Sequence, residues 1–192
     1  AGRFWKMIQD HKVTVFYTAP TAIRSLIKAA EGNEAVHPKR YDLSSLRGMI
    51  VGGAAAPQSM IEAYEKKYGI PVYHAWGMTE MSPLGTVNTP KGKHPKLSAA
   101  ERDTLRLNQG RPIYGVDMKI VDDSGRELPR DGKAFGDLLV RGPWIVSGYF
   151  KGEGGNVLRE GGWFPTGDVA TLDPDGYMQI TDRSKDVIKS GG

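Results

Sequence analysis

Residues 47–74 read RGMIVGGAAAPQSMIEAYEKKYGIPVYH, and this stretch decides the fold. It begins with a short apolar run, residues 47–51, that is typical of a buried strand. Pro57 then stands near the start of a helix and Gly69 follows its end, an arrangement that marks both helix boundaries. Residues 70–74 form a second apolar strand. A strand, a helix and a strand of these lengths predict a parallel sheet covered by helices.

The same alternation extends toward the N-terminus. There the spacing of apolar residues predicts a helix over residues 4–11, a strand over 13–17 and a helix over 22–31. After Gly85 the pattern changes, because helical periodicity gives way to short β-branched and apolar runs between Gly and Pro turns. The fold therefore has two parts of different character.

In the second part, Ser98 and Glu101 have capping-box spacing and predict a helix to about residue 108. Short strands are expected at Asp117–Asp122, Gly136–Arg141, Asp168–Leu172 and Tyr177–Thr181. Residues 173–176, DPDG, predict a hairpin turn, because Pro presets φ and Gly accepts a positive φ. We predict an α/β fold: a parallel sheet with covering helices, followed by a small antiparallel β-barrel-like subdomain.

Composition limits the function. The chain has 192 residues, 39% of them hydrophobic, which is enough for one large domain or two small ones. The net charge of +4 is too small to indicate nucleic-acid binding, although it suits a polyanionic small substrate. Cysteine is absent, so disulfides, thiolate catalysis and Cys-ligated zinc are excluded, and a cytoplasmic location is the expectation. No run approaches the ~20 apolar residues that a transmembrane segment needs.

Both ends look like the interior of a longer sequence. The first residues, AGRFWKMI, lack an initiator Met and the apolar run of a signal peptide, and they have the spacing of an amphipathic helix. The last residues, KSGG, end in a turn-like sequence. We therefore expect the chain to be a fragment.

Four segments carry groups suited to a nucleotide. Trp76 offers a flat ring for a base, although a buried core Trp is an equally good interpretation. Thr79 offers a hydroxyl for a phosphate and Glu80 an oxygen ligand for magnesium. Gly52 and Gly53 would let the backbone approach a flat ligand, but an ordinary strand-to-helix turn is the simpler interpretation.

The other two segments lie in the last third of the chain. Asp168 follows Thr166 and Gly167 and could accept from two ribose hydroxyls, although an Asx turn explains the local pattern. Arg183 could reach a ribose or a phosphate with its planar guanidinium. It lies in a run of alternating charges, residues 182–186, that usually indicates a solvated linker.

Taken in order, these motifs resemble the adenylate-forming superfamily of acyl-CoA synthetases, peptide-synthetase adenylation domains and luciferases. The matching blocks are Gly52–Ala54, Trp76–Glu80, Gly136–Gly142, Thr166–Asp168 and Asp182–Gly192. Three further segments resemble the branch that acts on medium- and long-chain fatty acids: Gly110–Pro112, Gly142–Trp144 and Ser147–Tyr149. The resemblance implies part of the large domain of such an enzyme. Residues 1–110 would be its α/β part, 111–182 its β-rich part and 183–192 the hinge to a further domain.

The resemblance also implies roles for single residues. Thr79 would contact the α-phosphate and Glu80 the magnesium ion, and these two are the expected catalytic residues. Asp168 and Arg183 would hold the ribose, and Lys185 would be the hinge. The expected cofactor-binding set also includes Gly52, Gly53, Ala54, Ala75, Trp76, Gly77 and Met78, with Trp76 stacked on adenine and Gly77 leaving room for substrate.

Some features depart from the family pattern. Trp76 replaces the commoner Tyr, and Asp137 replaces the usual Glu. The family's T-G-x-P-K-G phosphate loop and its catalytic lysine match nothing in these 192 residues. We therefore expect the chain alone to be an inactive fragment of the enzyme.

The implied reaction uses ATP, Mg²⁺ and CoA to convert a fatty acid to an acyl-adenylate, with release of pyrophosphate, and then to acyl-CoA with release of AMP. Related alternatives are a ligase for short, aromatic or sulfur-containing acids and an amino-acid adenylation domain. A non-catalytic nucleotide-binding module is an alternative of another class. Nucleic acid is not an expected partner, and a homodimer of the full-length protein is compatible with the family.

Overall fold

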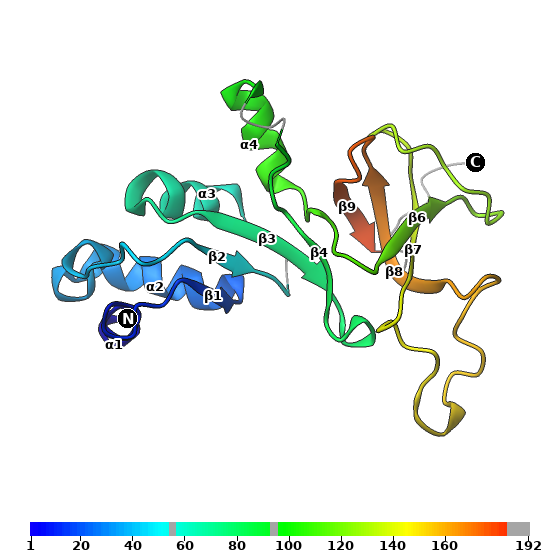
Figure 1. Ribbon diagram of the computed structural model, residues 1–192, viewed down its shortest axis with the longest axis horizontal. Coiled ribbons are helices and arrows are strands. Elements are labelled where there is room, and N and C mark those ends of the chain that lie inside the picture. Colours follow the sequence, from blue (N-terminus) through cyan, green and yellow to red (C-terminus); the bar gives the residue numbers. More distant parts are fainter. Residues whose placement is uncertain (54–56, 93–95, 184–192) are drawn as a thin grey trace. The chain divides into compact units, whose positions relative to one another are not determined.

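The protein is described by a computed structural model that covers residues 1–53, 57–92 and 96–183 (Figure 1). Two compact units divide the chain, one from Ala1 to Ala75 and one from Trp76 onward. Each unit has its own architecture. Within the described ranges, no helix is long and apolar enough to cross a bilayer.

The first unit alternates helices and strands. Its helices are α1 (Gly2–Asp10), α2 (Pro20–Gly32) and α3 (Gln58–Glu62), with 3-10 turns η1 (Glu34–Val36) and η2 (Pro38–Arg40) and a π-helical turn η3 (Ala63–Lys67). Its strands are β1 (Val15–Thr18), β2 (Gly48–Val51) and β3 (Val72–Gly77), the last of which runs on into the second unit. β1 pairs with β2, and β2 with β3, in parallel register. The predicted parallel sheet is confirmed.

Apolar side chains fix the helices of this unit. Trp5 and Ile8 on α1 and Ile23 on α2 are fully buried. The buried hydroxyl of Tyr64 donates a hydrogen bond of 3.1 Å to the carbonyl of Ile23, and this bond joins η3 to α2. Burial raises the pKa of the Tyr64 phenol, since the charged form would be desolvated. These contacts hold the helices against the three strands.

The second unit is mainly β. Its strands are β4 (Leu84–Val87), β5 (Arg111–Pro112), β6 (Asp117–Val121), β7 (Phe135–Arg141), β8 (Phe164–Leu172) and β9 (Met178–Arg183). The short helical segments are η4 (Thr79–Met81), α4 (Ala99–Leu107) and η6 (Phe150–Gly152). β4 pairs antiparallel with β5, and β6 to β9 form a four-stranded antiparallel sheet in sequence order.

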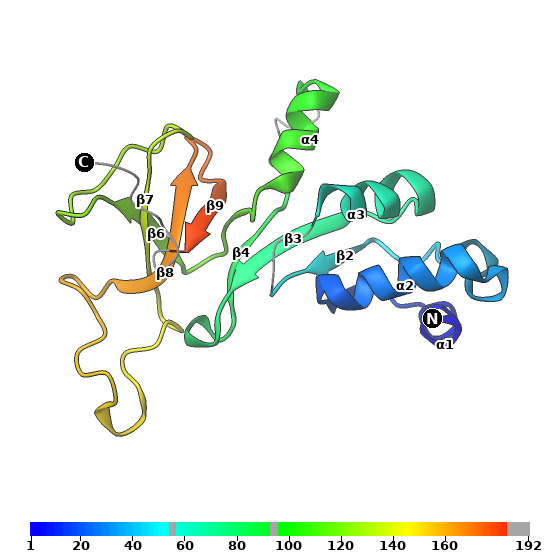
Figure 2. The ribbon, with the colours of Figure 1, turned by 180° about the vertical axis from the view of Figure 1, so that it is seen from behind.

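This antiparallel sheet is curled, as the two opposite views show (Figures 1 and 2). Buried apolar side chains from all four of its strands form one core cluster. Register shifts lie between Asp137 and Leu139 on β7 and between Val169 and Ala170 on β8. Such irregularities bend a strand and increase its twist. The predicted antiparallel, barrel-like part is confirmed.

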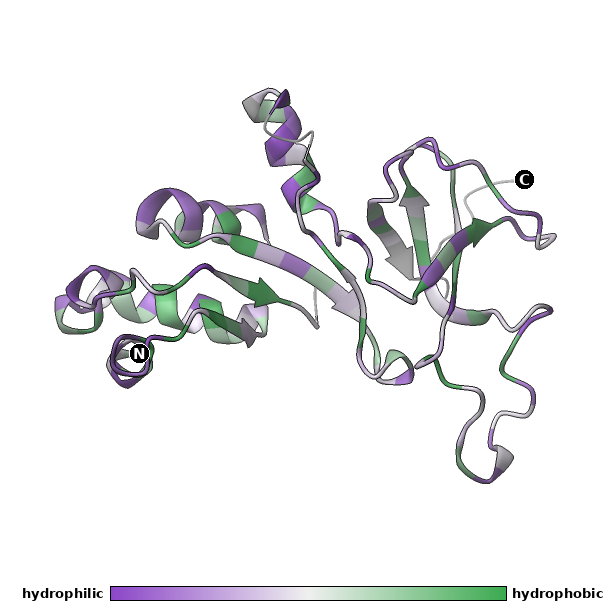
Figure 3. Ribbon diagram, viewed as in Figure 1, coloured by the Kyte–Doolittle hydropathy of each residue, from purple (hydrophilic) through white to green (hydrophobic). Residues whose placement is uncertain are grey.

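Local signals in this unit were also correct. The side chain of Ser98 accepts from the backbone N–H of Glu101 (3.3 Å), and a Glu101 carboxylate oxygen accepts from the N–H of Ser98 (2.8 Å). This capping box starts α4, which is predominantly hydrophilic (Figure 3). At the DPDG turn the N–H of Gly176 donates to Asp173 O (2.9 Å), and Gly176 has a φ of 83°.

Two strands are longer than predicted. β3 continues through Gly77 instead of ending at His74, so Trp76 lies within the strand. β8 begins at Phe164 instead of Asp168, so Thr166, Gly167 and Asp168 lie inside a paired strand. Both extensions carry predicted site residues, which makes the strand ends part of the candidate site.

Candidate functional site

The segment after β3 is tightly folded. A Cβ on Gly77 would lie 1.9 Å from the backbone oxygen of Pro83, so the two backbones approach at a distance that only glycine permits. The chain then turns through η4, where the N–H of Ser82 donates to Thr79 O (3.1 Å). Ser82 itself has a left-handed φ of 58°. The space beside Gly77, expected to admit a substrate, is therefore filled by the protein's own backbone.

Trp76 and Asp168 meet directly although they are 92 residues apart. The indole Nε1 donates a hydrogen bond of 3.0 Å to Asp168 Oδ2, and the side chains are buried, with 9% exposure for Trp76 and 5% for Asp168. A Cβ on Gly85 would come within 2.9 Å of the Trp76 ring, so that part of the indole is covered by backbone. Trp76 therefore serves in this structure as a buried hydrogen-bond donor within the apolar core.

Asp168 is fixed from its own strand as well. Its N–H donates to Thr166 Oγ1 (3.1 Å), while that hydroxyl donates to the carbonyl of Leu138 on β7 (3.0 Å). Between them Gly167 has a φ of 76° and open space at the position of a Cβ. The local pattern is thus a distorted strand tied to β7 by Thr166, and it is not the isolated Asx turn that was the simpler interpretation.

Asp168 and Arg183, the two residues expected to hold a ribose, are cross-strand partners. Asp168 on β8 pairs with Arg183 at the end of β9. Paired residues on neighbouring strands have Cα atoms about 4.5–5.5 Å apart, close enough to contact one ligand group. The side chain of Arg183 is not among those described, and Lys185 and Ala54 lie outside the described residues.

Glu80 lies in a second hydrogen-bonded cluster. The hydroxyl of Tyr149 donates to Glu80 Oε1 (2.9 Å), and the backbone N–H of Val146 donates to Glu80 O (2.8 Å). Nearby, Ser82 Oγ donates to the carbonyl of Trp144 (3.1 Å). The hydrogen bond to Glu80, together with desolvation and the negative charge of that carboxylate, raises the pKa of Tyr149. We call these three bonds the loop clasp, because they join residues 144–149 to residues 80–82.

Thr79 and Met78 flank this carboxylate. Thr79 is exposed at the start of η4, so its hydroxyl is accessible to a ligand. Met78 is partly buried and packs against the apolar core of the curled sheet. Of these two residues, Thr79 is therefore the polar and exposed one.

A single carboxylate is available here for a metal ion. Among the residues the structure describes, no three His, Asp or Glu side chains gather in a group that could hold a metal. Mg²⁺ in nucleotide sites is usually bound by one or two carboxylates together with substrate phosphates and water. Partly buried Glu80, which follows the exposed residue Thr79 in η4, fits that mode of binding.

The glycine turn belongs to the first unit. A Cβ on Gly52 would lie 2.6 Å from the hydroxyl of Tyr17 and 3.1 Å from the carbonyl of Ala75, so a side chain there would be crowded and the exposed end of Tyr17 would have to move. Gly53 is exposed, with a φ of 90° and open space around it. The structure thus places Gly52 beside Ala75, two of the predicted cofactor-binding residues.

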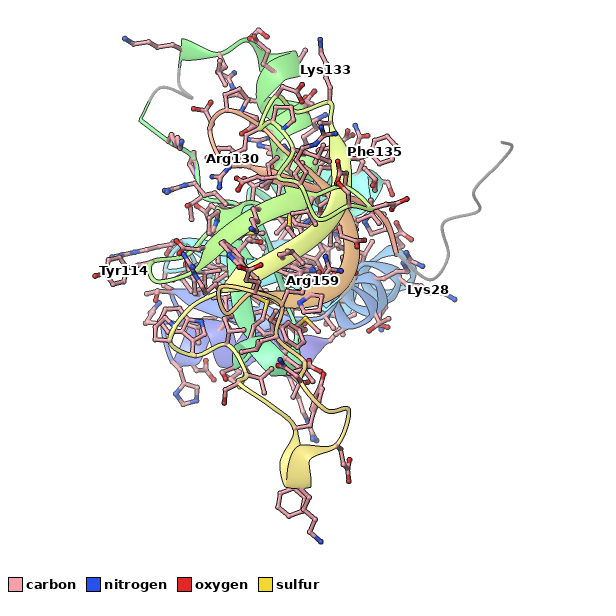
Figure 4. The ribbon with its side chains drawn as sticks, turned by 90° about the vertical axis from the view of Figure 1, so that its right-hand side faces the viewer. Lys28, Tyr114, Arg130, Lys133, Phe135 and Arg159 are labelled. Carbon is pink, nitrogen blue, oxygen red and sulfur yellow. The ribbon has the colours of Figure 1, made fainter. Side chains whose placement is uncertain are left out.

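Tyr149 was missed as a site residue by sequence reasoning. Ser147–Tyr149 was noted only as a mark of one branch of the superfamily, since a tyrosine in a glycine-containing loop carries no local signal for a carboxylate partner. Asp137, the other departure, accepts from the guanidinium of Arg159 (3.3 Å), a residue labelled in Figure 4. That partly exposed ion pair gives the shorter carboxylate a structural role on β7.

Known enzymes resemble this chain in sequence. A family model described as AMP-binding enzyme matches residues 1–150. The chain is 59% identical over 188 residues to a 3-methylmercaptopropionyl-CoA ligase of Ruegeria lacuscaerulensis, covering 97% of this chain and 33% of that protein. It is 48% identical over 187 residues to a medium-chain-fatty-acid–CoA ligase of Ectopseudomonas oleovorans, with the same two coverages. The chain spans about a third of the length of these curated relatives.

Solved structures show the same fold. The o-succinylbenzoate coenzyme A synthetase of Bacillus subtilis, in complex with ATP and a magnesium ion, matches with a TM-score of 0.76 and 29% identity over 99% of this chain and 36% of that chain. A long-chain-fatty-acid–CoA ligase of Archaeoglobus fulgidus matches with a TM-score of 0.78 and 28% identity over 94% of this chain and 36% of that chain. The expected fold class is confirmed by these similarities.

Proposed function

Because the chain belongs to the AMP-binding enzyme family, we propose that it forms part of the nucleotide site of an ATP-dependent acid–CoA ligase. The observation that carries the proposal is the hydrogen bond between Trp76 and Asp168. It brings the aromatic motif and the T-G-D motif together, as a single adenosine site requires. The comparisons support the same class, since the similar curated proteins named above are acyl-CoA ligases.

Asp168 is proposed to hold the ribose. Trp76 occupies Oδ2 with a hydrogen bond, which fixes the plane of the carboxylate and orients Oδ1. Two ribose hydroxyls are donors, and hydrogen bonds to a charged acceptor contribute about 1.5–3 kcal/mol. Arg183 lies opposite on β9 and would add a cation beside the same sugar. In this proposal Trp76 acts on the nucleotide mainly through Asp168, and its ring edge limits the space left for the base.

Thr79 and Glu80 are proposed to act at the phosphates. The exposed hydroxyl of Thr79 would donate to an α-phosphate oxygen, and the carboxylate of Glu80 would hold Mg²⁺. When bound, this ion would offset the negative charge on the phosphate oxygens. The protein's contribution is the fixed placement of both groups at the turn after β3, which is the positioning that phosphoryl and adenylyl transfer need.

The proposed reaction has two steps. A carboxylate oxygen of the acid attacks the α-phosphorus of ATP, the bond to the bridging oxygen breaks, and pyrophosphate leaves with the electron pair. The thiol of CoA, which loses its proton to solvent, then attacks the acyl carbon, and AMP leaves. No protein nucleophile is needed in either step, which agrees with a sequence that contains no cysteine.

We propose a short or medium-length acid with an apolar or thioether tail as the substrate. Identity is 59% and 50% to two 3-methylmercaptopropionyl-CoA ligases, 48% to the medium-chain ligase and 43% to a long-chain ligase of Thermus thermophilus. This order favours the sulfur-containing alternative over the long-chain acid. A thioether sulfur is close to a methylene in shape, and one methylene in an apolar pocket changes selectivity by about 10–200-fold. Overlapping use of both acid types is therefore expected.

The test uses the complete gene product that contains these 192 residues. Pyrophosphate release is measured with ATP, Mg²⁺ and a panel of acids: 3-methylmercaptopropionate, pentanoate, octanoate, palmitate and benzoate. We expect release that depends on the acid, and acyl-CoA when CoA is added, with the highest kcat/KM for 3-methylmercaptopropionate or a medium-chain acid.

Asp168→Ala is the matching variant for the nucleotide site. We expect it to raise the Kd for ATP by about tenfold or more, from the loss of charged hydrogen bonds. ATP binding without acid-dependent pyrophosphate release would favour the non-catalytic nucleotide-binding module. Unchanged ATP affinity in the variant would show that Asp168 does not hold the nucleotide.

A further inference from the structure

We infer that Tyr149 is a positioning residue for Glu80, so that the loop between β7 and β8 controls how well the site binds Mg²⁺ with ATP. The inference rests on the proposed function, in which Glu80 is the metal ligand. It assigns a role to a tyrosine that lies 69 residues away from that carboxylate in the sequence. Its basis is the geometry of the loop clasp.

The hydrogen bond between Tyr149 and Glu80 has ordinary geometry. The Tyr149 hydroxyl and Glu80 Oε1 are 2.9 Å apart, a normal distance for a hydrogen bond to a carboxylate. Within the described residues, Oε2 of Glu80 accepts no hydrogen bond. One oxygen is thus held by protein and the other is left for a ligand. This division of labour is common at metal sites, where a second hydrogen bond orients the ligating group.

The other two bonds of the loop clasp hold Glu80 by its backbone and Ser82 by its side chain. The backbone of Glu80 is held by Val146 and the neighbouring Ser82 by the carbonyl of Trp144. Three bonds therefore join this loop to η4 and to Ser82, the residue that follows it, but only the bond from Tyr149 touches the carboxylate. The backbone contacts fix where Glu80 lies, while Tyr149 fixes how its side chain is turned.

A Glu80 side chain that is free to rotate must be ordered when it binds a metal ion. A glutamate has three rotatable bonds, and ordering such a side chain costs up to about 1.5–2 kcal/mol. The Tyr149 hydroxyl supplies part of this ordering before the metal arrives. Tyr149 is 42% exposed and Glu80 is only partly buried, so solvent weakens the bond and the effect is moderate. We therefore expect the loss of this bond to raise the Mg²⁺ concentration that the site needs by about three- to tenfold. This is at or below the low end of the effects of residues that orient metal ligands.

The experiment compares Tyr149→Phe with wild type in the complete gene product. The Kd for ATP is measured by calorimetry without Mg²⁺ and over a Mg²⁺ titration, in the absence of acid and CoA. We expect the Mg²⁺ concentration that gives half of the affinity gain to rise three- to tenfold. The Kd for Mg²⁺-free ATP should stay within twofold, because Tyr149 touches neither base nor ribose in the proposal.

Ser82→Ala is the matched control. It removes a hydrogen bond of the same loop clasp, from Ser82 Oγ to Trp144 O, without touching the Glu80 carboxylate. Its Mg²⁺ midpoint should shift much less than that of Tyr149→Phe, because the bond from Val146 still holds the backbone of Glu80. In a Glu80→Gln background, Tyr149→Phe should produce no additional change, because the group it orients is gone. Thermal unfolding of each variant verifies that it folds.

The possible results distinguish a failure of this inference from a failure of the proposed function. A midpoint raised much more in Tyr149→Phe than in Ser82→Ala supports the inference. An unchanged or lower midpoint, or an equal rise in Ser82→Ala, overturns it while the proposed ligase stands. If wild type binds ATP with no dependence on Mg²⁺, or Glu80→Gln retains the full dependence, the assignment of Glu80 fails and the role of Tyr149 fails with it.

Discussion

The two carboxylates of the candidate site are held in the same way in opposite surroundings. Asp168 accepts from the indole of Trp76 at 3.0 Å, and Glu80 accepts from the phenol of Tyr149 at 2.9 Å. The first pair is almost fully buried, with exposures of 9% and 5%, whereas Tyr149 is 42% exposed. Bond length is thus nearly equal, and burial is the variable that differs.

This difference separates stability from positioning. A buried carboxylate that loses a donor cannot replace it with water, so the desolvation cost appears in the free energy of unfolding. An exposed carboxylate exchanges the lost donor for a water molecule at little cost. We therefore expect the Trp76 pair to support the fold and the nucleotide together, and the Tyr149 pair to affect ligand binding almost alone.

The largest expected effect is at the buried pair. Trp76→Phe should lower the free energy of unfolding by about 3 kcal/mol, because Asp168 loses a buried donor and the smaller ring leaves a void in the core. It should also weaken ATP binding, since the carboxylate loses the indole donor at Oδ2. Urea-induced unfolding and ATP calorimetry measure the two effects.

Trp163→Phe is the control for that prediction. Trp163 is only partly buried and lies between the cations of Lys119 and Arg141, with Nζ 4.6 Å and Cζ 4.5 Å from the ring centre. Phe keeps a ring face for both cations, so the loss should stay below about 1 kcal/mol. An equal loss at both positions would mean that burial of the hydrogen bond is not the deciding factor.

The second-largest effect on stability is expected at Gly77, which lies between Trp76 and Glu80 in the sequence. Gly77 follows Trp76 and precedes the turn that carries Glu80, and a Cβ there would meet Pro83 O at 1.9 Å. Since a backbone atom must move, Gly77→Ala should cost about 2–3 kcal/mol in stability and also disturb ATP binding. Gly148→Ala, in the loop beside Tyr149, has nothing within 4 Å of the added Cβ and should be nearly neutral. Comparable unfolding midpoints for the two variants would contradict this explanation.

The architecture could be predicted because its signals are local. Residue spacing records the helical segment between Pro57 and Gly69, which the structure forms as α3 and the π-helical turn η3, and also the strands on either side of it. The capping box at Ser98 needs only four consecutive residues. Antiparallel strands between Gly and Pro turns were likewise visible. The strands β4 and β5 were not predicted, and the ends of β3 and β8 were misjudged at the points where Trp76 and Asp168 meet.

The missing part of the site depends on contacts between distant residues. No local window shows that Trp76 will donate to Asp168, or that Tyr149 will reach Glu80, because each bond closes a loop of many residues. Gly77 illustrates the same limit. A glycine beside a motif suggests space for a ligand, but the atom that requires it is the carbonyl of Pro83. The resemblance identified most of the motif positions, and the structure supplies the partners.

A third, smaller effect on stability is expected at Glu101, an exposed carboxylate in the capping box of α4. Hydrogen bonds from Ser98 lower the pKa of Glu101. A carboxyl whose folded-state pKa is lowered adds stability above its unfolded pKa, about 4.3, and this stability is lost as pH falls through the folded value. Ser98→Ala should therefore destabilise the protein more at pH 7 than at pH 3. Unfolding midpoints at both pH values test the sign, and a larger loss at pH 3 would contradict it.

The smallest expected effect on stability is at the exposed pair. Tyr149→Phe removes one donor from one carboxylate, as Trp76→Phe does, yet we expect the free energy of unfolding to change by less than about 0.5 kcal/mol, because water replaces the hydroxyl at Glu80. Urea-induced unfolding of the two variants under identical conditions gives the comparison directly. A loss at Tyr149 close to that at Trp76 would show that the loop clasp supports the fold. A difference of several-fold would show that burial, together with the void left by the smaller ring, decides how much a hydrogen bond of this length adds to stability.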